Sequence, residues 1–198
     1  MHISILTFEG FNELDSFIAY GILNRVRLEG WRVTIASPSE RPCSMNGLVV
    51  DRQATLAQAC SADAVLIGSG LQTRQIAEND GLMAQLALDP ARQLVAAQCS
   101  GALLLARLGV LEGVPACTDL TTCPWLVDAG VDVLEQPFYQ QGNIATAGGC
   151  LASVYLAAWL VWRLAGQAAV EQAVHYVAPV GEKTDFVEQV LCRIQSVG

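Results

Sequence analysis

The sequence has 198 residues, of which 53% are hydrophobic and 15% are charged, and its net charge is −8. This much apolar surface excludes an intrinsically disordered chain, because a disordered chain has too little of it to form a core. Lys and Arg form no cluster, so the basic footprint of a protein that binds nucleic acid or anionic lipid is missing. We therefore expect neither a nucleic acid nor a membrane as a partner.

The first half of the chain alternates apolar strand patterns with helical patterns. The predicted elements are a strand at 2–8, a helix at 11–30, a strand at 31–38, a short hairpin around Asn46-Gly47, a helix at 54–60, a strand at 62–68, a helix at 73–88 interrupted at Asp80-Gly81, a strand at 92–98 and a helix at 99–109. The strands are apolar along nearly their whole length, which is typical of strands covered on both faces.

The second half continues in the same way. The predicted elements are a helix at 121–130, strands at 131–136, 137–141 and 143–148, helices at 150–166 and 167–177, and a tail at 181–198 that adds a last amphipathic turn or two. The apolar run at 150–162 spans roughly 20 Å as a helix, too short to cross a bilayer. We expect a single α/β domain over residues 1–198, a flavodoxin-like three-layer αβα sandwich with a mostly parallel central sheet.

Seven cysteines stand at 43, 60, 99, 117, 123, 150 and 192. Their number is odd, no CxxC occurs, and no histidine lies at ligand spacing, so neither a disulfide framework nor a zinc site is expected. The opening segment HISILTFEG lacks the basic leader and cleavage pattern of a signal peptide. These features predict reduced thiols in the cytoplasm and no metal or cofactor.

The segment LVAAQCSGALLLARLG carries the strongest sign of chemistry. An apolar strand runs directly into Cys99, and a helix starts at once with Ser100 and Gly101. This is the pattern of a strand–nucleophile–helix turn, in which small neighbours permit a tight backbone and the helix N-terminus favours the reactive thiolate. The alternative is an inert core cysteine, which is common for this residue type. We favour the nucleophile.

Two further strand ends are expected to complete a pocket around Cys99. The loop Gly68-Ser69-Gly70 follows its own strand, and the backbone N–H groups of Gly70 and Ser100 would form an oxyanion hole. The alternative for this loop is a simple glycine turn. Cys150, which follows Gly148-Gly149, imitates the Cys99 turn, but we expect it to line the pocket or pack, with Gly149 and Ser69 also near the substrate. Cys123 is expected in a pocket wall or in the core.

The order and content of several segments resemble the ThiJ/PfpI superfamily, which has the class I glutamine-amidotransferase-like fold. The segments, which span nearly the whole chain, are FEGFNELDSFIAYGIL, ASPSERPCSMNGLVV, ADAVLIGSG, LVAAQCSGALLLARLGVLEG and QQGNIATAGGCLASVYLAAWLV. The FNELD element resembles the branch that contains isonitrile hydratase (isocyanide hydratase). That resemblance implies that Asp15, Cys99 and Ser100 are catalytic. Ser100 departs from the threonine usual there, and the glycine loop lacks one usual glycine.

The resemblance also points to a missing histidine. Superfamily proteases, glyoxalases and amidotransferases pair the cysteine with a histidine after a later strand, but the corresponding segment ACTDLTTCPWL has none. His2 opens the first strand, at the end of the sheet opposite the site, and His175 lies late in a helix. We therefore expect no Cys–His pair. Taken alone, Asp15 is most simply a first-turn acid favoured by the helix dipole, or an N-cap, with Glu9 and Glu13 as competitors. The resemblance makes it the acid–base partner of Cys99.

The resemblance implies an enzyme that hydrates an isonitrile to an N-formamide through a covalent Cys99 thioimidate. Its small-molecule substrate would be its main partner, together with a second copy of the chain in a homodimer whose interface uses the first helix. Two alternatives stay open: a glyoxalase or deglycase activity on small oxoaldehydes, which the missing histidine disfavours, and a non-enzymatic redox or ligand sensor built on Cys99.

Overall fold

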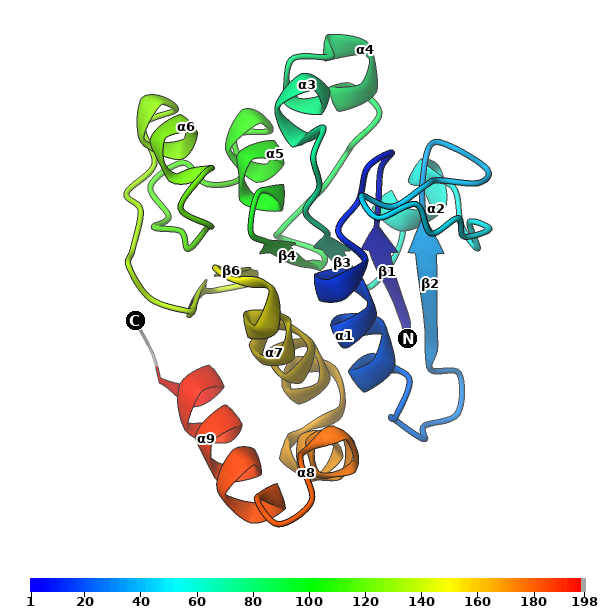
Figure 1. Cartoon of the computed structure of the whole chain (residues 1–198), viewed down its shortest axis with the longest axis vertical. Helices are drawn as coiled ribbons and strands as arrows, with labels where there is room; N and C mark the ends of the chain where they lie inside the picture. Colours follow the sequence, from blue (N-terminus) through cyan, green and yellow to red (C-terminus); the bar gives the residue numbers. More distant parts are fainter. Residues whose placement is uncertain (197–198) are drawn as a thin grey trace.

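A six-stranded sheet forms the middle of the protein (Figure 1). The computed structural model describes residues 1–196, so the last two residues of the predicted tail lie outside the described part of the chain. The strands are β1 (His2–Leu6), β2 (Arg32–Ala36), β3 (Ala64–Ile67), β4 (Leu94–Gln98), β5 (Phe138–Gln141) and β6 (Ile144–Ala147). Their order is β2-β1-β3-β4-β6-β5, and every neighbouring pair is parallel except β5 with β6. The predicted α/β fold with a mostly parallel sheet is confirmed.

Helices cover both faces of the sheet and make three layers (Figure 1). One face carries α1 (Glu13–Leu23), α7 (Ser153–Ala165), α8 (Gln167–Val177) and α9 (Lys183–Gln195). The other face carries α2 (Leu56–Cys60), α3 (Thr73–Ala77), α4 (Asp80–Met83), α5 (Gly101–Arg107) and α6 (Cys123–Asp128). A short 3-10 helix, η1 (Cys150–Ala152), leads into α7.

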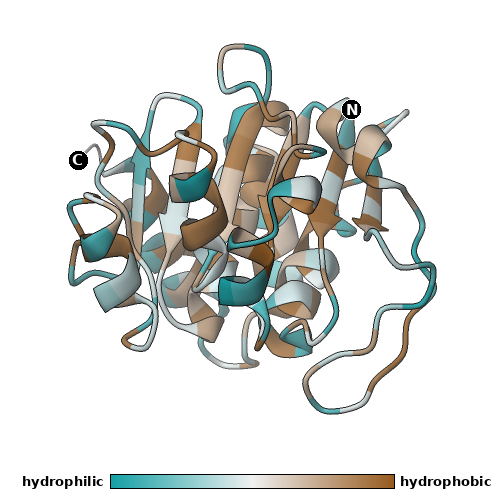
Figure 2. Ribbon diagram, turned by 90° about the horizontal axis from the view of Figure 1, so that it is seen from above, coloured by the Kyte–Doolittle hydropathy of each residue, from teal (hydrophilic) through white to brown (hydrophobic). Residues whose placement is uncertain are grey.

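Alternate residues of each strand enter different hydrophobic layers. Ile5 and Leu66 belong to the cluster beneath α1 and α7, whereas Val65 and Ile67 belong to the cluster beneath α5. This follows from the two-residue period of a strand, and it explains why both kinds of position are apolar. The strands that cross the middle of the molecule are accordingly hydrophobic in Figure 2, while teal polar residues concentrate on the outer elements.

Three predicted elements differ from the structure. The segment 131–136 is not a strand, because its bridge, through Val133, is to the loop residue Ala116 rather than to the sheet. The first helix ends at Leu23 instead of at residue 30. Its last carbonyls find other partners: the Asn24 side chain donates to the Tyr20 carbonyl, and the indole of Trp31 donates to the Leu23 carbonyl.

The third difference is the tail, which forms the full helix α9 rather than one or two turns. Val190 and Ile194 of α9 are buried in the cluster shared with α7 and α8, so tertiary packing stabilises a helix whose own sequence is a weak signal. Elsewhere the predictions agree with the structure. An isolated antiparallel β-bridge between the backbones of Cys43 and Val49 closes a hairpin around Asn46-Gly47. The region 73–88 is divided into α3 and α4 as predicted, but the break lies at residues 78–79 rather than at 80–81. Within residues 1–196, no helix combines the length and apolarity needed to span a membrane.

Candidate active site

Cys99 lies at the carboxyl edge of the sheet, in the turn between β4 and α5. Its φ of 45° is in the left-handed region, and among residues 1–196 no other non-glycine residue has a positive φ. This conformation costs an ordinary residue about 1–2 kcal/mol. Gly101 makes the turn possible, because a Cβ there would lie 2.7 Å from the Ile67 carbonyl oxygen. The tight strand–cysteine–helix turn expected from the sequence is therefore present, and Cys99 is only 4% exposed.

Asp15 reaches the same edge from the first turn of α1. It is not the helix cap, because the side chain of Asn12 takes that position and accepts from the Leu14 N–H. The Asp15 carboxyl is fully buried and accepts hydrogen bonds from the hydroxyls of Ser69 and Ser16. Burial raises the pKa of Asp15 to about 6, against the opposing effect of these two hydroxyls. A carboxyl with this pKa can exchange a proton near neutral pH.

The thiol of Cys99 is held by the side chain that precedes it. The amide Nε2 of Gln98 donates to Cys99 Sγ at 3.3 Å and to the Gly149 carbonyl at 2.9 Å. Burial raises the pKa of Cys99 to about 12, and the nearby charge of Asp15 acts in the same direction, while the Gln98 hydrogen bond opposes them. Burial thus opposes the thiolate that the helix N-terminus is expected to favour, and the nucleophilic role of Cys99 stays a prediction.

Asp15, Cys99 and Cys150 form one cluster. One oxygen of the Asp15 carboxylate and the two sulfur atoms all lie within 4.8 Å of one another. The two sulfurs and the carboxylate are a donor set that suits a soft metal ion, although both carboxylate oxygens already accept serine hydroxyls. The expectation of a site that works without metal or cofactor stays a prediction.

A cavity of about 310 Å³ opens onto this cluster. This volume is at the small end of ligand pockets, so it suits a molecule of few heavy atoms. The wall mixes apolar, hydroxyl and charged side chains from six separate segments. The lining residues are Asn12, Met45, Ser69, Gly70, Leu71, Thr73, Arg74, Cys99, Ser100, Asp119, Thr121, Thr122, Trp125 and Cys150.

Ser100 does not contact Asp15. Its Oγ lies 2.8 Å from the Thr73 hydroxyl and accepts from the Gly70 N–H at 3.2 Å. The hydroxyls that hold the Asp15 carboxyl are those of Ser69 and Ser16, and the catalytic role implied for Ser100 stays a prediction. The predicted oxyanion donor Gly70 is likewise engaged with Ser100, so this N–H would reach a ligand only if Ser100 turned away.

The glycines around the site are required by close backbone approaches. A Cβ at Gly70 would lie 2.7 Å from the Gly10 carbonyl oxygen, and one at Gly148 would lie 2.3 Å from the Thr118 carbonyl oxygen. Gly149 has a φ of 87°, and its carbonyl faces the Gln98 amide. Gly149 therefore shapes the site through its backbone turn and its carbonyl.

The remaining sequence candidates lie outside this cavity. His2 Nε2 pairs with the Thr34 hydroxyl at the amino end of β1, and His175 is exposed on α8, as expected. Cys123 lines a neighbouring cavity rather than that of Cys99. Glu9 accepts from the Cys43 N–H.

Sequence reasoning missed Gln98 and Asn12, which donate to Cys99 and Cys150 respectively. A lone buried amide closing an apolar strand was the available signal for Gln98.

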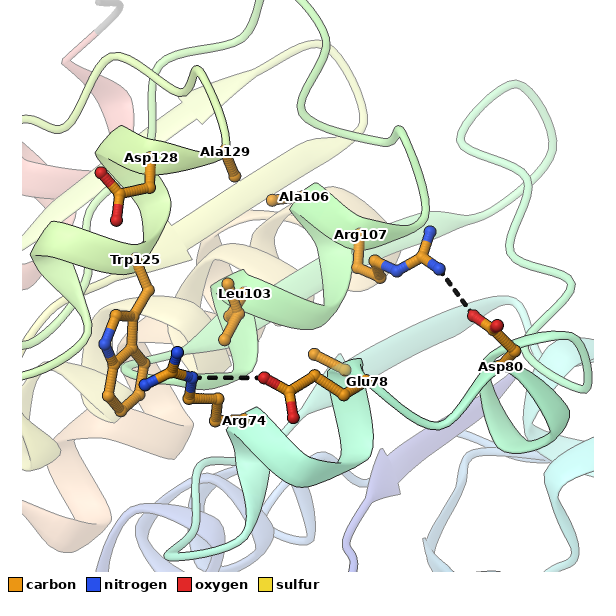
Figure 3. Close-up of a pocket in the computed structure, with 10 residues that line it drawn as sticks. Arg74, Glu78, Asp80, Leu103, Ala106, Arg107, Trp125, Asp128 and Ala129 are labelled. Atoms are coloured by element: carbon orange, nitrogen blue, oxygen red, sulfur yellow. Dashed lines mark hydrogen bonds and ion pairs between the residues drawn. The ribbon is translucent and has the colours of Figure 1, made fainter.

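A second cavity of about 640 Å³ adjoins the first and shares Arg74 and Trp125 with it. Figure 3 shows the Arg74 guanidinium against the Trp125 ring, with its carbon 5.3 Å from the ring centre, and paired with Glu78 at 3.3 Å. Arg74 and Trp125 therefore belong to the wall that the two cavities share, and they bring a cation and an aromatic face to it.

The comparisons with known proteins identify the family and agree with the fold. A model of the DJ-1/PfpI family matches residues 1–162, whereas no curated protein matches. Among solved structures, a ThiJ/PfpI family protein from Pseudomonas syringae is similar with a TM-score of 0.79 and 20% identity, over 98% of this chain and 90% of that one. Drosophila melanogaster DJ-1beta is similar with a TM-score of 0.75 and 22% identity, over 89% and 96%. An AraC family transcriptional regulator from Pseudomonas putida is similar with a TM-score of 0.77 and 20% identity, over 89% of this chain and 99% of that one.

Proposed function

This chain belongs to the DJ-1/PfpI family, and within that family we propose that it is a cysteine-dependent hydratase that converts a small isonitrile into an N-formamide. The observation that carries the proposal is the buried Asp15 carboxyl within 4.8 Å of Cys99 Sγ, together with a cavity that Cys99 lines and to whose wall residues 1–196 contribute no histidine. Such a pair can supply and remove protons, which is what hydration of an isonitrile requires.

The first step uses the single proton that the pair holds at neutral pH. Since the pKa of Asp15 is about 6 and that of Cys99 about 12, the sulfur carries the proton and the carboxylate is ionised. As an isonitrile approaches, Asp15 takes the S–H proton and the sulfur forms a bond to the terminal carbon. Asp15 then delivers the same proton to that carbon, which leaves a covalent thioimidate and an ionised carboxylate.

The second step consumes one water. Asp15 removes a proton from the water as its oxygen bonds to the imidate carbon, and it passes this proton to the nitrogen. The carbon–sulfur bond then breaks, the new hydroxyl becomes the formyl carbonyl, and its proton returns to Cys99. The Gln98 amide, which donates to Cys99 Sγ, stabilises negative charge on sulfur during attack and release. The sum is one isonitrile and one water giving one N-formamide.

The cavity wall argues against the rival chemistry. Glyoxalase- and peptidase-type relatives need a histidine beside the cysteine, and both histidines of this chain lie outside the cavity. The substituent of the isonitrile would be small and largely apolar, because Met45, Leu71 and Trp125 face the same space. Sensing without turnover is the alternative that remains, since the same thiol can react with oxidants.

The test is a turnover screen with small isonitriles and, in parallel, α-oxoaldehydes. We expect N-formamide to appear by NMR with the wild type and with His175→Ala, and not with Cys99→Ala. Conversion of an oxoaldehyde but of no isonitrile would replace the hydratase with the glyoxalase alternative. No turnover of either class by correctly folded wild type would leave the sensor.

A further inference from the structure

Cys150 is the second thiol of the site, and its contacts differ from those of a packing residue. Its sulfur lies within 4.8 Å of Cys99 Sγ and lines the same cavity. Its side chain is only partly buried, and the amide Nδ2 of Asn12 donates to its sulfur at 3.2 Å. The site thus contains two thiols, each with its own amide donor.

The backbone holds these two thiols at neighbouring strand ends. Strands β4 and β6 pair in parallel with Gln98 opposite Ala147, and the Cys99 N–H donates to the Ala147 carbonyl at 2.8 Å. Cys150 therefore follows its strand by three residues, whereas Cys99 follows its strand directly. The Gln98 amide ties the two segments together through Cys99 Sγ and the Gly149 carbonyl. A disulfide would bring the two sulfurs from their present separation, within 4.8 Å, to about 2.05 Å.

We propose that Cys150 is a resolving cysteine that forms an intramolecular disulfide with Cys99 after a hydroperoxide has oxidised Cys99. The hydroperoxide transfers one oxygen to the Cys99 sulfur, its O–O bond breaks, and it leaves as water or an alcohol, so Cys99 becomes a sulfenic acid. The Cys150 sulfur then attacks Cys99, the sulfur–oxygen bond breaks, and one water leaves. A dithiol reduces the disulfide back to two thiols.

This disulfide would act as a reversible stop on Cys99 chemistry. It removes the nucleophile from the cavity, and it also protects Cys99 from the further, irreversible steps of sulfur oxidation. The inference uses the reactivity of Cys99 on which the proposed function also rests, but it does not depend on the isonitrile as substrate.

The experiment treats the reduced full chain with equimolar hydrogen peroxide and maps its peptides by mass spectrometry. In the wild type we expect a linked pair of peptides containing Cys99 and Cys150, an intact mass lower by two hydrogen atoms, and recovery of both thiols with dithiothreitol. Cys192→Ser, which removes an exposed thiol on α9, is the matched control and should form the same link. In Cys150→Ser, dimedone should instead trap Cys99 as its sulfenic acid, and in a parallel sample without dimedone an excess of hydrogen peroxide should add further oxygen atoms to Cys99.

A wild type in which Cys99 gains oxygen while Cys150 keeps a free thiol would overturn the proposal. So would equal rates of Cys99 over-oxidation in the wild type and in Cys150→Ser, with near-identical circular dichroism spectra showing that both are folded. The two proposals fail separately. A linked pair without isonitrile turnover removes only the hydratase, and turnover without a linked pair removes only the resolving role.

Discussion

The two strand-to-helix junctions that end in cysteine look alike in sequence and differ in structure. At the first, Cys99 itself adopts the left-handed backbone, with a φ of 45°, and is almost completely buried. At the second, Gly149 adopts it, with a φ of 87°, and Cys150 follows in an ordinary 3-10 turn with its side chain partly exposed. The position of the residue with positive φ therefore determines where the thiol lies. When the cysteine itself has the positive φ, its thiol lies directly at the strand end, and when a glycine before it does, the thiol lies further along the chain. Strain is concentrated on Cys99, as at many functional positions.

The largest expected difference between the junctions is in turnover. Cys99→Ala removes the sulfur placed to form the thioimidate, so isonitrile hydration should fall to the blank rate. Cys150→Ala removes one contact from the cavity wall, and we expect a loss of about tenfold, the scale of one altered pocket contact. Steady-state kinetics on the same isonitrile compares them. Equal, complete loss in both variants would mean that the second thiol also takes part in the chemistry.

The next prediction separates the proton-transfer role of Asp15 from its charge. Asp15→Asn should lower turnover by roughly 10²-fold, typical of a general acid–base group. It should also speed alkylation of Cys99 by iodoacetamide at neutral pH by roughly tenfold, because removing a like charge within 4.8 Å lowers the pKa of the thiol. Iodoacetamide reacts with the thiolate form, which exchanges its proton with solvent, so alkylation does not need Asp15 as a proton donor. Peptide mapping gives the alkylation rate, with the exposed Cys192 of α9 as an internal reference.

Unchanged turnover in Asp15→Asn would remove Asp15 from the mechanism. Slower alkylation of Cys99 would mean that the carboxylate helps rather than opposes the thiolate.

A third prediction concerns the two glycines that place Cys150. Gly148→Ala should destabilise the fold by about 3 kcal/mol, since its Cβ would lie 2.3 Å from a backbone carbonyl oxygen. Gly149→Ala should cost about 1 kcal/mol, because open space surrounds that position and only the positive φ is disfavoured. Urea denaturation measures both. Equal costs would show that the Thr118 loop moves aside for the added methyl group.

The fold could be predicted largely from the sequence because its strands are apolar on both faces and its turns carry glycine. The strand predicted at 131–136 is wrong because an apolar, extended pattern does not show which segment pairs with it. Its Val133 pairs with the loop residue Ala116 and not with a strand of the sheet. The helix α9 was underpredicted because its stability depends on burial of Val190 and Ile194 against distant helices.

For the site, the sequence predicts that Cys99, Ser69, Gly70 and Cys150 lie at one edge of the sheet, because all of them follow strands that run in parallel. Which hydroxyl holds Asp15 could not be predicted, because Ser69, Ser16 and Ser100 are equivalent in composition and differ only in the direction of their side chains. The pKa of Cys99 could not be predicted from the sequence either. A sequence pattern indicates a helix N-terminus, which favours the thiolate, but it does not show how deeply the thiol is buried, and burial raises its pKa.

The last prediction uses Asp15 again, now through stability. The pKa of this carboxyl is about 6 in the folded protein and 3.8 for an unperturbed group, so the folded chain binds the proton more tightly than the unfolded chain. Stability from this group is therefore full below about pH 4 and is lost as the pH rises through about 6, by on the order of 2–3 kcal/mol. The amide introduced by Asp15→Asn cannot ionise, so that variant lacks this loss. The free energy of unfolding of the variant, relative to the wild type, should rise between about pH 4 and pH 7.

Ser16→Ala is the control that keeps the carboxyl and removes one of its two hydroxyl donors, so its pKa should rise further. In that variant the fall of stability should continue to higher pH than in the wild type. A difference between wild type and Asp15→Asn that stays constant across this range would mean that the carboxyl ionises as it does in water. Asp15 would then be too acidic to return a proton to substrate at neutral pH, and the proton transfer assigned to it beside Cys99 would need another donor.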